Sequence, residues 1–176
     1  MRVKAGARIL CQVAFAVICF TAAHASAQGV TTELEVVGEV NASLRLTVDG
    51  LRAVAAHSAR NLPAAASNAL AEPYREYSGV LLTELLDKAG LHSERKDDSR
   101  RLYVVATASD GYKAVFSWGE LFNSRIGRGL LVVFERNGKP IDDSEGRIAL
   151  LSTEDDRMGP RHVRWLKRIE VRRIAD

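Results

Sequence analysis

The chain has 176 residues, 47% of them hydrophobic and 27% charged, and its formal charge is +3. This excess comes from Arg2, Lys4 and Arg8, so residues 28–176 are neutral and give no electrostatic reason to expect a nucleic-acid partner. The two cysteines, Cys11 and Cys19, also precede residue 28, which excludes a disulfide, a thiolate metal ligand and a cysteine nucleophile from the rest of the chain.

Residues 1–27 have the pattern of a secretory signal peptide. Basic residues come first, an apolar run follows over residues 9–23, and Ala25-Ser26-Ala27 matches an A-x-A cleavage site. A membrane anchor is the alternative, but the run is shorter than the roughly 20 residues that span a bilayer. We therefore predict cleavage after Ala27, no membrane insertion afterwards, and a single periplasmic domain at residues 28–176.

Apolar periodicity predicts the elements of the first half of this domain. They are strands at residues 33–40 and 42–48, a helical turn at 51–54, and a helix that residues 77–80 introduce. Residues 53–72 have no period and contain Pro63, which indicates a long surface connection. Gly90 ends the helix. Its apolar residues at helical spacing are Leu81, Leu82, Leu85, Leu86 and Ala89.

The second half reads as strands separated by tight turns. After a charged, solvated segment at residues 93–101, strands are predicted at 102–106, 112–116, 129–134, 147–151 and 166–174. Asp110-Gly111 and Asn137-Gly138 are turns, as is the polar segment 142–146. Ser117 and Glu120 have the spacing of a capping box that opens a short helix. The predicted class is therefore α+β, with a mixed, mainly antiparallel sheet and a few short helices.

The sequence contains no motif of a catalytic or metal site. His57, His92 and His162 lack the short spacing of a zinc site, and the acidic segments 142–145 and 154–156 lack that of a calcium loop. There is no G-x-S-x-G elbow, G-x-G-x-x-G loop or P-loop. We therefore predict no catalytic residue and no metal ligand.

Two segments could form a binding site instead. Ser109 and Asp110 either only make a turn or also border a pocket, since turns at sheet ends often hold ligands. The basic cluster at residues 157–164, which contains Arg157, Arg161, His162 and Arg164, is either ordinary surface charge or a pocket for an anion or a flat heteroaromatic ring.

The two tryptophans differ in what their positions predict. Trp165 is expected inside an alternating strand, where a tryptophan normally packs in the core. Trp118 stands beside a helix start. It is therefore the better candidate for stacking on a ligand ring.

Two segments together resemble the molybdopterin-binding domain of the sulfite oxidase family. The first is Ser109-Asp110-Gly111-Tyr112 with residues 117–121, and the second is residues 159–166 with Ile169-Glu170-Val171. The order of residues 77–86 and of the turn at 137–140 matches as well. The resemblance covers nearly all of residues 28–176. It implies that fold, and it implies that the Asp110 turn and Arg161-His162-Val163 help to hold a pterin.

Departures from the family pattern change the expected ligand. The family's molybdenum-ligating cysteine would fall within residues 53–72, which contain none, so oxo transfer is not expected. Glu145-Gly146-Arg147 stands where the family has a histidine and a glycine, and a carboxylate there would oppose a phosphate-bearing cofactor. The resemblance thus implies a free pterin rather than molybdopterin, with no obligatory cofactor. Asp110 or Glu145 would accept hydrogen bonds from the amino group and ring N–H of the pterin, and Arg161 or His162 would face the oxo group of the pterin.

This chain resembles a small, exported relative of the family, and its residues 28–176 contain no cysteine. Such relatives resemble periplasmic pterin-binding proteins that regulate membrane-bound cyclic-di-GMP enzymes. The resemblance implies a non-catalytic pterin sensor that docks on the periplasmic domain of a membrane signalling protein. The alternatives are a molybdenum-cofactor oxidoreductase with another metal ligand, and an adaptor that binds only protein. The predicted ligand-binding residues are Ser109, Asp110, Tyr112, Trp118, Glu145, Arg157, Arg161, His162 and Val163.

Overall fold

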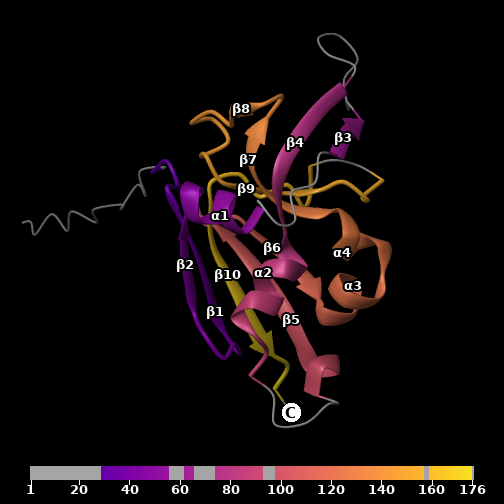
Figure 1. Ribbon diagram of the computed structural model, residues 1–176. Helices are drawn as coiled ribbons and strands as arrows, with labels where there is room; N and C mark the ends of the chain where they lie inside the picture. Colours follow the sequence, from indigo (N-terminus) through magenta and orange to yellow (C-terminus); the bar gives the residue numbers. More distant parts are fainter. Residues whose placement is uncertain (1–28, 56–61, 66–73, 93–97, 157–158, 176) are drawn as a thin grey trace, which may run out of the picture.

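The computed structural model describes residues 29–55, 62–65, 74–92, 98–156 and 159–175. These residues form two sheets with short helices between and beside them (Figure 1). No helix within the described ranges is both long enough and apolar enough to cross a membrane. The predicted leader and cleavage site lie outside the described residues.

The first sheet has the last strand of the chain at its centre. Its strands are β1 (Glu33–Gly38), β2 (Leu44–Thr47), β5 (Leu102–Ala108), β6 (Lys113–Ser117) and β10 (Leu166–Arg173), in the order β2-β1-β10-β5-β6. Only β1 and β10 pair in parallel. Leu166 at the start of β10 lies opposite Ala108 at the end of β5. This register brings the segment before β10 next to the turn between β5 and β6.

The second sheet is antiparallel throughout. Its strands are β3 (Leu62–Ala65), β4 (Tyr74–Leu81), β7 (Leu130–Arg136), β8 (Lys139–Pro140) and β9 (Ala149–Ser152). β7 pairs with β4, β8 and β9, and its first five residues are buried. A strand covered on both faces reads as a continuous apolar run, as residues 130–134 do.

Short helices connect the strands. They are α1 (Val48–Ala55), α2 (Leu82–Ala89), the 3₁₀ helix η1 (Asp98–Arg101), α3 (Trp118–Asn123) and α4 (Arg125–Gly129). Gly90, with φ of 67°, ends α2 as predicted. Ser117 caps α3: its hydroxyl accepts from the Glu120 amide, and the Glu120 carboxylate accepts from the Ser117 amide.

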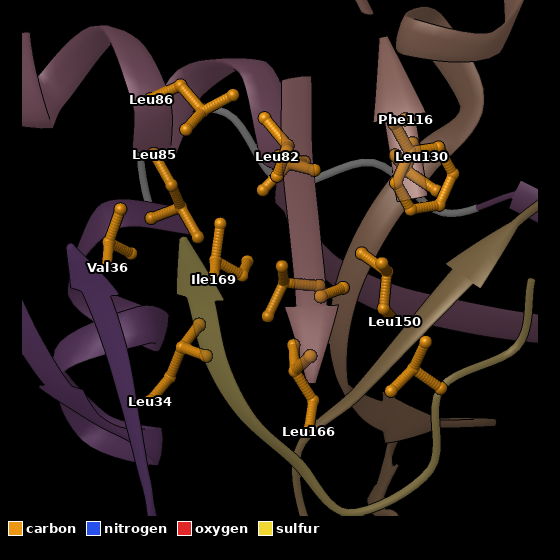
Figure 2. Close-up of a cluster of buried hydrophobic side chains, with 14 of the residues drawn as sticks. Leu34, Val36, Leu82, Leu85, Leu86, Phe116, Leu130, Leu150, Leu166 and Ile169 are labelled. Carbon is orange, nitrogen blue, oxygen red and sulfur yellow. The ribbon is translucent and has the colours of Figure 1, made fainter. Parts of the chain in front are cut away.

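The main core fills the space between the two sheets. Figure 2 shows Leu34 and Val36 of β1 and Ile169 of β10 gathered around the α2 leucines Leu82, Leu85 and Leu86, with Phe116, Leu130 and Leu150 nearby. A smaller cluster covers the other face of the second sheet, where Leu131, Val133 and Leu151 pack with Tyr77 and Ile141. Residues 130–134 thus alternate between the two clusters.

The predicted α+β class with a mainly antiparallel arrangement is confirmed, although the strands divide between two sheets. The predictions for strands at 102–106, 129–134 and 166–174 and for the turns at 110–111 and 137–138 are also confirmed, to within a few residues at strand ends. The first two strands combine an apolar run with a glycine turn, and residues 166–174 alternate apolar and basic residues, so local sequence determines these elements.

The helix predicted after residues 77–80 is confirmed as α2. It begins one residue later than expected, because Leu81 and the residues that introduce the helix belong to β4 and pair with β7. Two other predictions in the first half were wrong. The helix α1 begins at Val48, where a strand end was expected. Within residues 53–72, predicted as a surface connection, Leu62–Ala65 form β3. This strand is at a sheet edge, a place that tolerates Pro63.

Candidate functional site

A pocket of about 270 Å³ lies where the β5–β6 turn meets the segment that precedes β10. Its lining residues are Asp110, Tyr112, Gly159, His162, Arg164 and Trp165. The register of β5 against β10 explains this meeting of distant segments. A backbone hydrogen bond of 2.9 Å from the Ser109 amide to the Trp165 carbonyl extends that register into the pocket.

The Asp110 side chain both makes the turn and faces the pocket. Its Oδ1 accepts a 2.9 Å hydrogen bond from the Tyr112 amide, while Gly111 has the positive φ of 93° that the turn requires. The Tyr112 hydroxyl donates to the Pro160 carbonyl and so ties the turn to the opposite wall. This arrangement leaves Oδ2 of Asp110 as an acceptor for a ligand.

Trp165 is held in the pocket wall by its backbone conformation and by contacts with residues 143–146. It has a left-handed backbone, with φ of 49°, just before β10 begins. Its amide donates to the Glu145 carbonyl at 2.8 Å, and its indole Nε1 donates to the Asp143 carbonyl at 2.9 Å. Gly146 lies directly against it, since a Cβ there would come within 3.0 Å of Trp165. The ring therefore has a defined orientation.

Behind the wall lies a buried pair of Glu145 and His162. Glu145 Oε2 is 3.6 Å from His162 Nε2, and neither atom has a hydrogen-bond partner within the described residues. The other oxygen, Oε1, accepts from Arg136. The interaction with His162 lowers the pKa of Glu145, desolvation opposes this, and Arg136 lowers it further. Glu145 does not line the pocket. It contacts His162, which does.

Arg161 does not reach the pocket. Its guanidinium pairs with Asp155 and with Glu120, the latter at 3.2 Å, and lies over the Phe116 ring. The hydrogen bond to Asp155 raises the pKa of Arg161. The predicted place of Arg161 opposite Asp110 is taken by Arg164, which makes no ion pair within the described part of the chain.

The remaining predicted residues are dispersed. Ser109 donates to the Gly29 carbonyl at 3.1 Å and lines a separate pocket of about 450 Å³. Trp118 stacks on Phe122, with ring centroids 4.5 Å apart, and packs on the core. Val163 is fully buried in the core. Arg157 lies outside the described residues. Trp118 is not among the residues that line the small pocket, whereas Trp165 is.

Sequence reasoning missed Gly159 and Trp165 as pocket residues and left Arg164 out of the predicted site. Trp165 was assigned to a strand interior, but it is the last residue before β10. Its position five residues after Pro160, in a segment that begins with a Gly-Pro turn, is the signal that could have identified it.

A larger pocket of about 870 Å³ lies elsewhere, between α1 and the segment after β8. Its basic residues are engaged: Arg52 pairs with Asp49 and Glu135, and Arg147 with Asp143. Phe134 lies under Arg52 at 5.6 Å. Because these side chains already satisfy one another, the smaller pocket is the better candidate for a polar ligand.

The architecture is that of an α+β domain with a small pocket lined mainly by polar side chains. The chain belongs to the oxidoreductase molybdopterin binding domain family, whose model matches residues 22–175. Among solved structures it is similar to the sulfane dehydrogenase SoxCD from Paracoccus pantotrophus, with a TM-score of 0.52 and 17% identity. The match covers 79% of this chain and 37% of that one, so this chain spans little more than a third of its length. A search of curated proteins finds no match.

Proposed function

We propose that this protein binds a free pterin in the pocket formed by Asp110, His162, Arg164 and Trp165, and acts as a non-catalytic sensor. The observation that carries the proposal is the meeting, in one small pocket, of an indole ring, a carboxylate, an imidazole and a guanidinium. Family membership supports recognition of a pterin ring system.

The chemistry of the wall complements the 2-amino-4-oxo edge of a pterin. That edge presents N–H donors beside a carbonyl acceptor. Asp110 Oδ2 can accept from the donors, and Arg164 can donate to the carbonyl. Trp165 offers a flat surface for stacking. The volume of about 270 Å³ is just below the roughly 300–1,000 Å³ of drug-sized sites, which suits a two-ring ligand.

The described residues fit the pterin ring better than the complete molybdenum cofactor. Among them, no group of three or more His, Cys, Asp or Glu side chains could hold a metal ion, and both cysteines precede residue 28. The cofactor's phosphate would need cations. Arg136, Arg147 and Arg161 are engaged with carboxylates, which leaves Arg164 as the one arginine for it among the described residues of the pocket lining. These features support a free pterin as the ligand.

The test is titration calorimetry or fluorescence with purified protein lacking residues 1–27. We expect binding of an oxidised or a reduced pterin, weakened about tenfold by Asp110→Asn, which can still accept from the Tyr112 amide but loses the charge. Asp156→Asn, an exposed residue outside the pocket, is the matched control and should bind as the parent protein does. If no pterin binds at high micromolar concentration, the proposal is rejected.

The molybdenum-dependent alternative rests on family membership alone. Elemental analysis after expression in a host that makes the cofactor distinguishes it. Stoichiometric molybdenum in the purified protein would favour an oxidoreductase. On our proposal the protein instead contains no molybdenum and retains a fluorescent pterin.

The proposal extends to location and partner. The leader pattern supports export to the periplasm, where the pterin-bound protein would dock on the periplasmic domain of a membrane signalling protein that controls cyclic-di-GMP. Co-purification of a tagged chain from membranes, compared with the Asp110→Asn variant, tests this. Ligand-dependent recovery of one membrane protein is expected. Recovery of none with either form would reject this partner.

A further inference from the structure

The buried pair behind the pocket has no role in the fold described so far. The Glu145 side chain is 8% exposed and that of His162 13%, and the facing atoms Oε2 and Nε2 lack hydrogen-bond partners among the described residues. Buried polar atoms left unpaired destabilise a fold, so such a pair calls for an explanation.

The carboxylate is anchored as an anion. Arg136 donates to its other oxygen, and Arg136 also pairs with Asp142 at 3.4 Å. The backbone on either side is held, because the Glu145 amide donates to the Asp142 carbonyl and the Glu145 carbonyl accepts from Trp165. A fixed negative charge therefore faces Nε2 of His162.

A carboxylate at one imidazole nitrogen favours the tautomer with the proton on that nitrogen. The neutral His162 ring would then carry its proton on Nε2, and its unprotonated Nδ1 would be the nitrogen left for a ligand. His162 is a lining residue of the pocket, whereas Glu145 is not. Glu145 therefore acts on a ligand only through His162.

We propose that Glu145 is a positioning residue that makes His162 a hydrogen-bond acceptor toward the pocket, so that the site selects ligands with an amino group at that edge. This inference rests on the proposed function and deepens it. With Asp110, the pocket then has two acceptors and one strong donor, Arg164. A ring bearing an amino group at that edge can donate to these acceptors. A ring with a carbonyl in place of the amino group would bring its own acceptor against an acceptor of the protein.

Two ligands differ at this edge of the ring. Pterin has an amino group at C2 and an unprotonated N1, and lumazine has a carbonyl at C2 and a proton on N1. We expect the parent protein to prefer pterin by about tenfold or more. Glu145→Gln should reduce that preference, because a neutral amide no longer fixes the tautomer and His162 can donate to the carbonyl. Asp143→Asn removes an exposed carboxylate from the same turn and is the control that should keep the preference.

The tautomer is measured directly by ¹⁵N NMR of the histidine ring in the ligand-free protein at neutral pH. We expect the Nε2–H form for His162 in the parent and Asp143→Asn proteins, and a shift toward Nδ1–H in Glu145→Gln. An Nδ1–H ring in the parent protein overturns the inference, whatever the variant does.

The two measurements separate this inference from the proposed function. A protein that shows the Nε2–H signature but binds no pterin supports the role of Glu145 and rejects the pterin. A protein that binds pterin and lumazine equally well, or whose His162 is Nδ1–H, keeps the pocket but rejects the role of Glu145.

Discussion

Gly146 shows how one residue decides whether Trp165 can form the pocket wall. It has φ of 88°, and a side chain there would meet the Trp165 ring and backbone. Its neighbour Glu145 holds Trp165 through a backbone hydrogen bond and His162 through its carboxylate. The short segment 145–146 therefore supports both the flat wall and the polar edge of the site.

We predict that Gly146→Ala weakens pterin binding and lowers the free energy of unfolding by about 2–4 kcal/mol, because positive φ and overpacking both oppose the methyl group. Chemical denaturation and ligand titration measure the two effects. Gly138→Ala is the control: it has φ of 70° but open space around it, so only the backbone cost of about 1–2 kcal/mol should appear. Equal losses in the two variants would contradict the proposed contact.

At the scale of elements, a capping-box residue of α3 also contacts the segment that precedes β10 and lines the pocket. The Glu120 carboxylate accepts from the Ser117 amide in the capping box and also pairs with Arg161. Arg161 lies in the segment that carries Gly159, His162 and Arg164 into the pocket. Arg161, which was predicted to contact the ligand, does not line the pocket, and its ion pairs fasten this segment to α3 and to Asp155.

Ser117→Ala should lower the free energy of unfolding by about 1 kcal/mol, since the Glu120 amide loses its cap. Urea unfolding followed by circular dichroism measures the change. Asn123→Ala, exposed in the last turn of the same helix, should stay within about 0.5 kcal/mol of the parent protein. A Ser117 variant as stable as the control would mean that the cap contributes nothing to stability.

Across the whole molecule, the main core joins the two sheets. Leu130 and Leu150 from the second sheet belong to the same buried cluster as Val36 and Ile169 from the first. Because β7 also supplies Leu131 to the smaller cluster, it links all the apolar packing described here. The pocket, which lies at the end of the first sheet, depends on this shared core for its geometry.

We therefore predict a single cooperative unfolding transition for residues 28–176. The fluorescence of Trp118 and Trp165, at the ends of first-sheet strands, should follow the same curve as far-UV circular dichroism. Leu130→Ala should shift both curves together, with a loss of about 2–5 kcal/mol. Val115→Ala, on the exposed face of β6, should shift them little. Curves that separate would show that the sheets unfold independently.

Local sequence determined much of this architecture and half of the site. Apolar runs bounded by glycine turns predicted β5 and β7, and alternation of apolar and basic residues predicted β10. The Asp110 turn and His162 were chosen from turn chemistry and side-chain type. The order of motifs also indicated the family, which the match over residues 22–175 confirms. These features depend on residues close together in the chain, where steric and hydrogen-bonding preferences act directly.

Tertiary structure decided the rest. β3 lies in a segment whose own pattern favours a loop, and it pairs with β4, which in turn pairs with β7. Whether Arg161 or Arg164 faces the pocket depends on which one meets Asp155 and Glu120. Trp165 rather than Trp118 lines the pocket because the β5–β10 register places it beside Asp110. Such choices depend on partners far away in sequence, which no local pattern encodes.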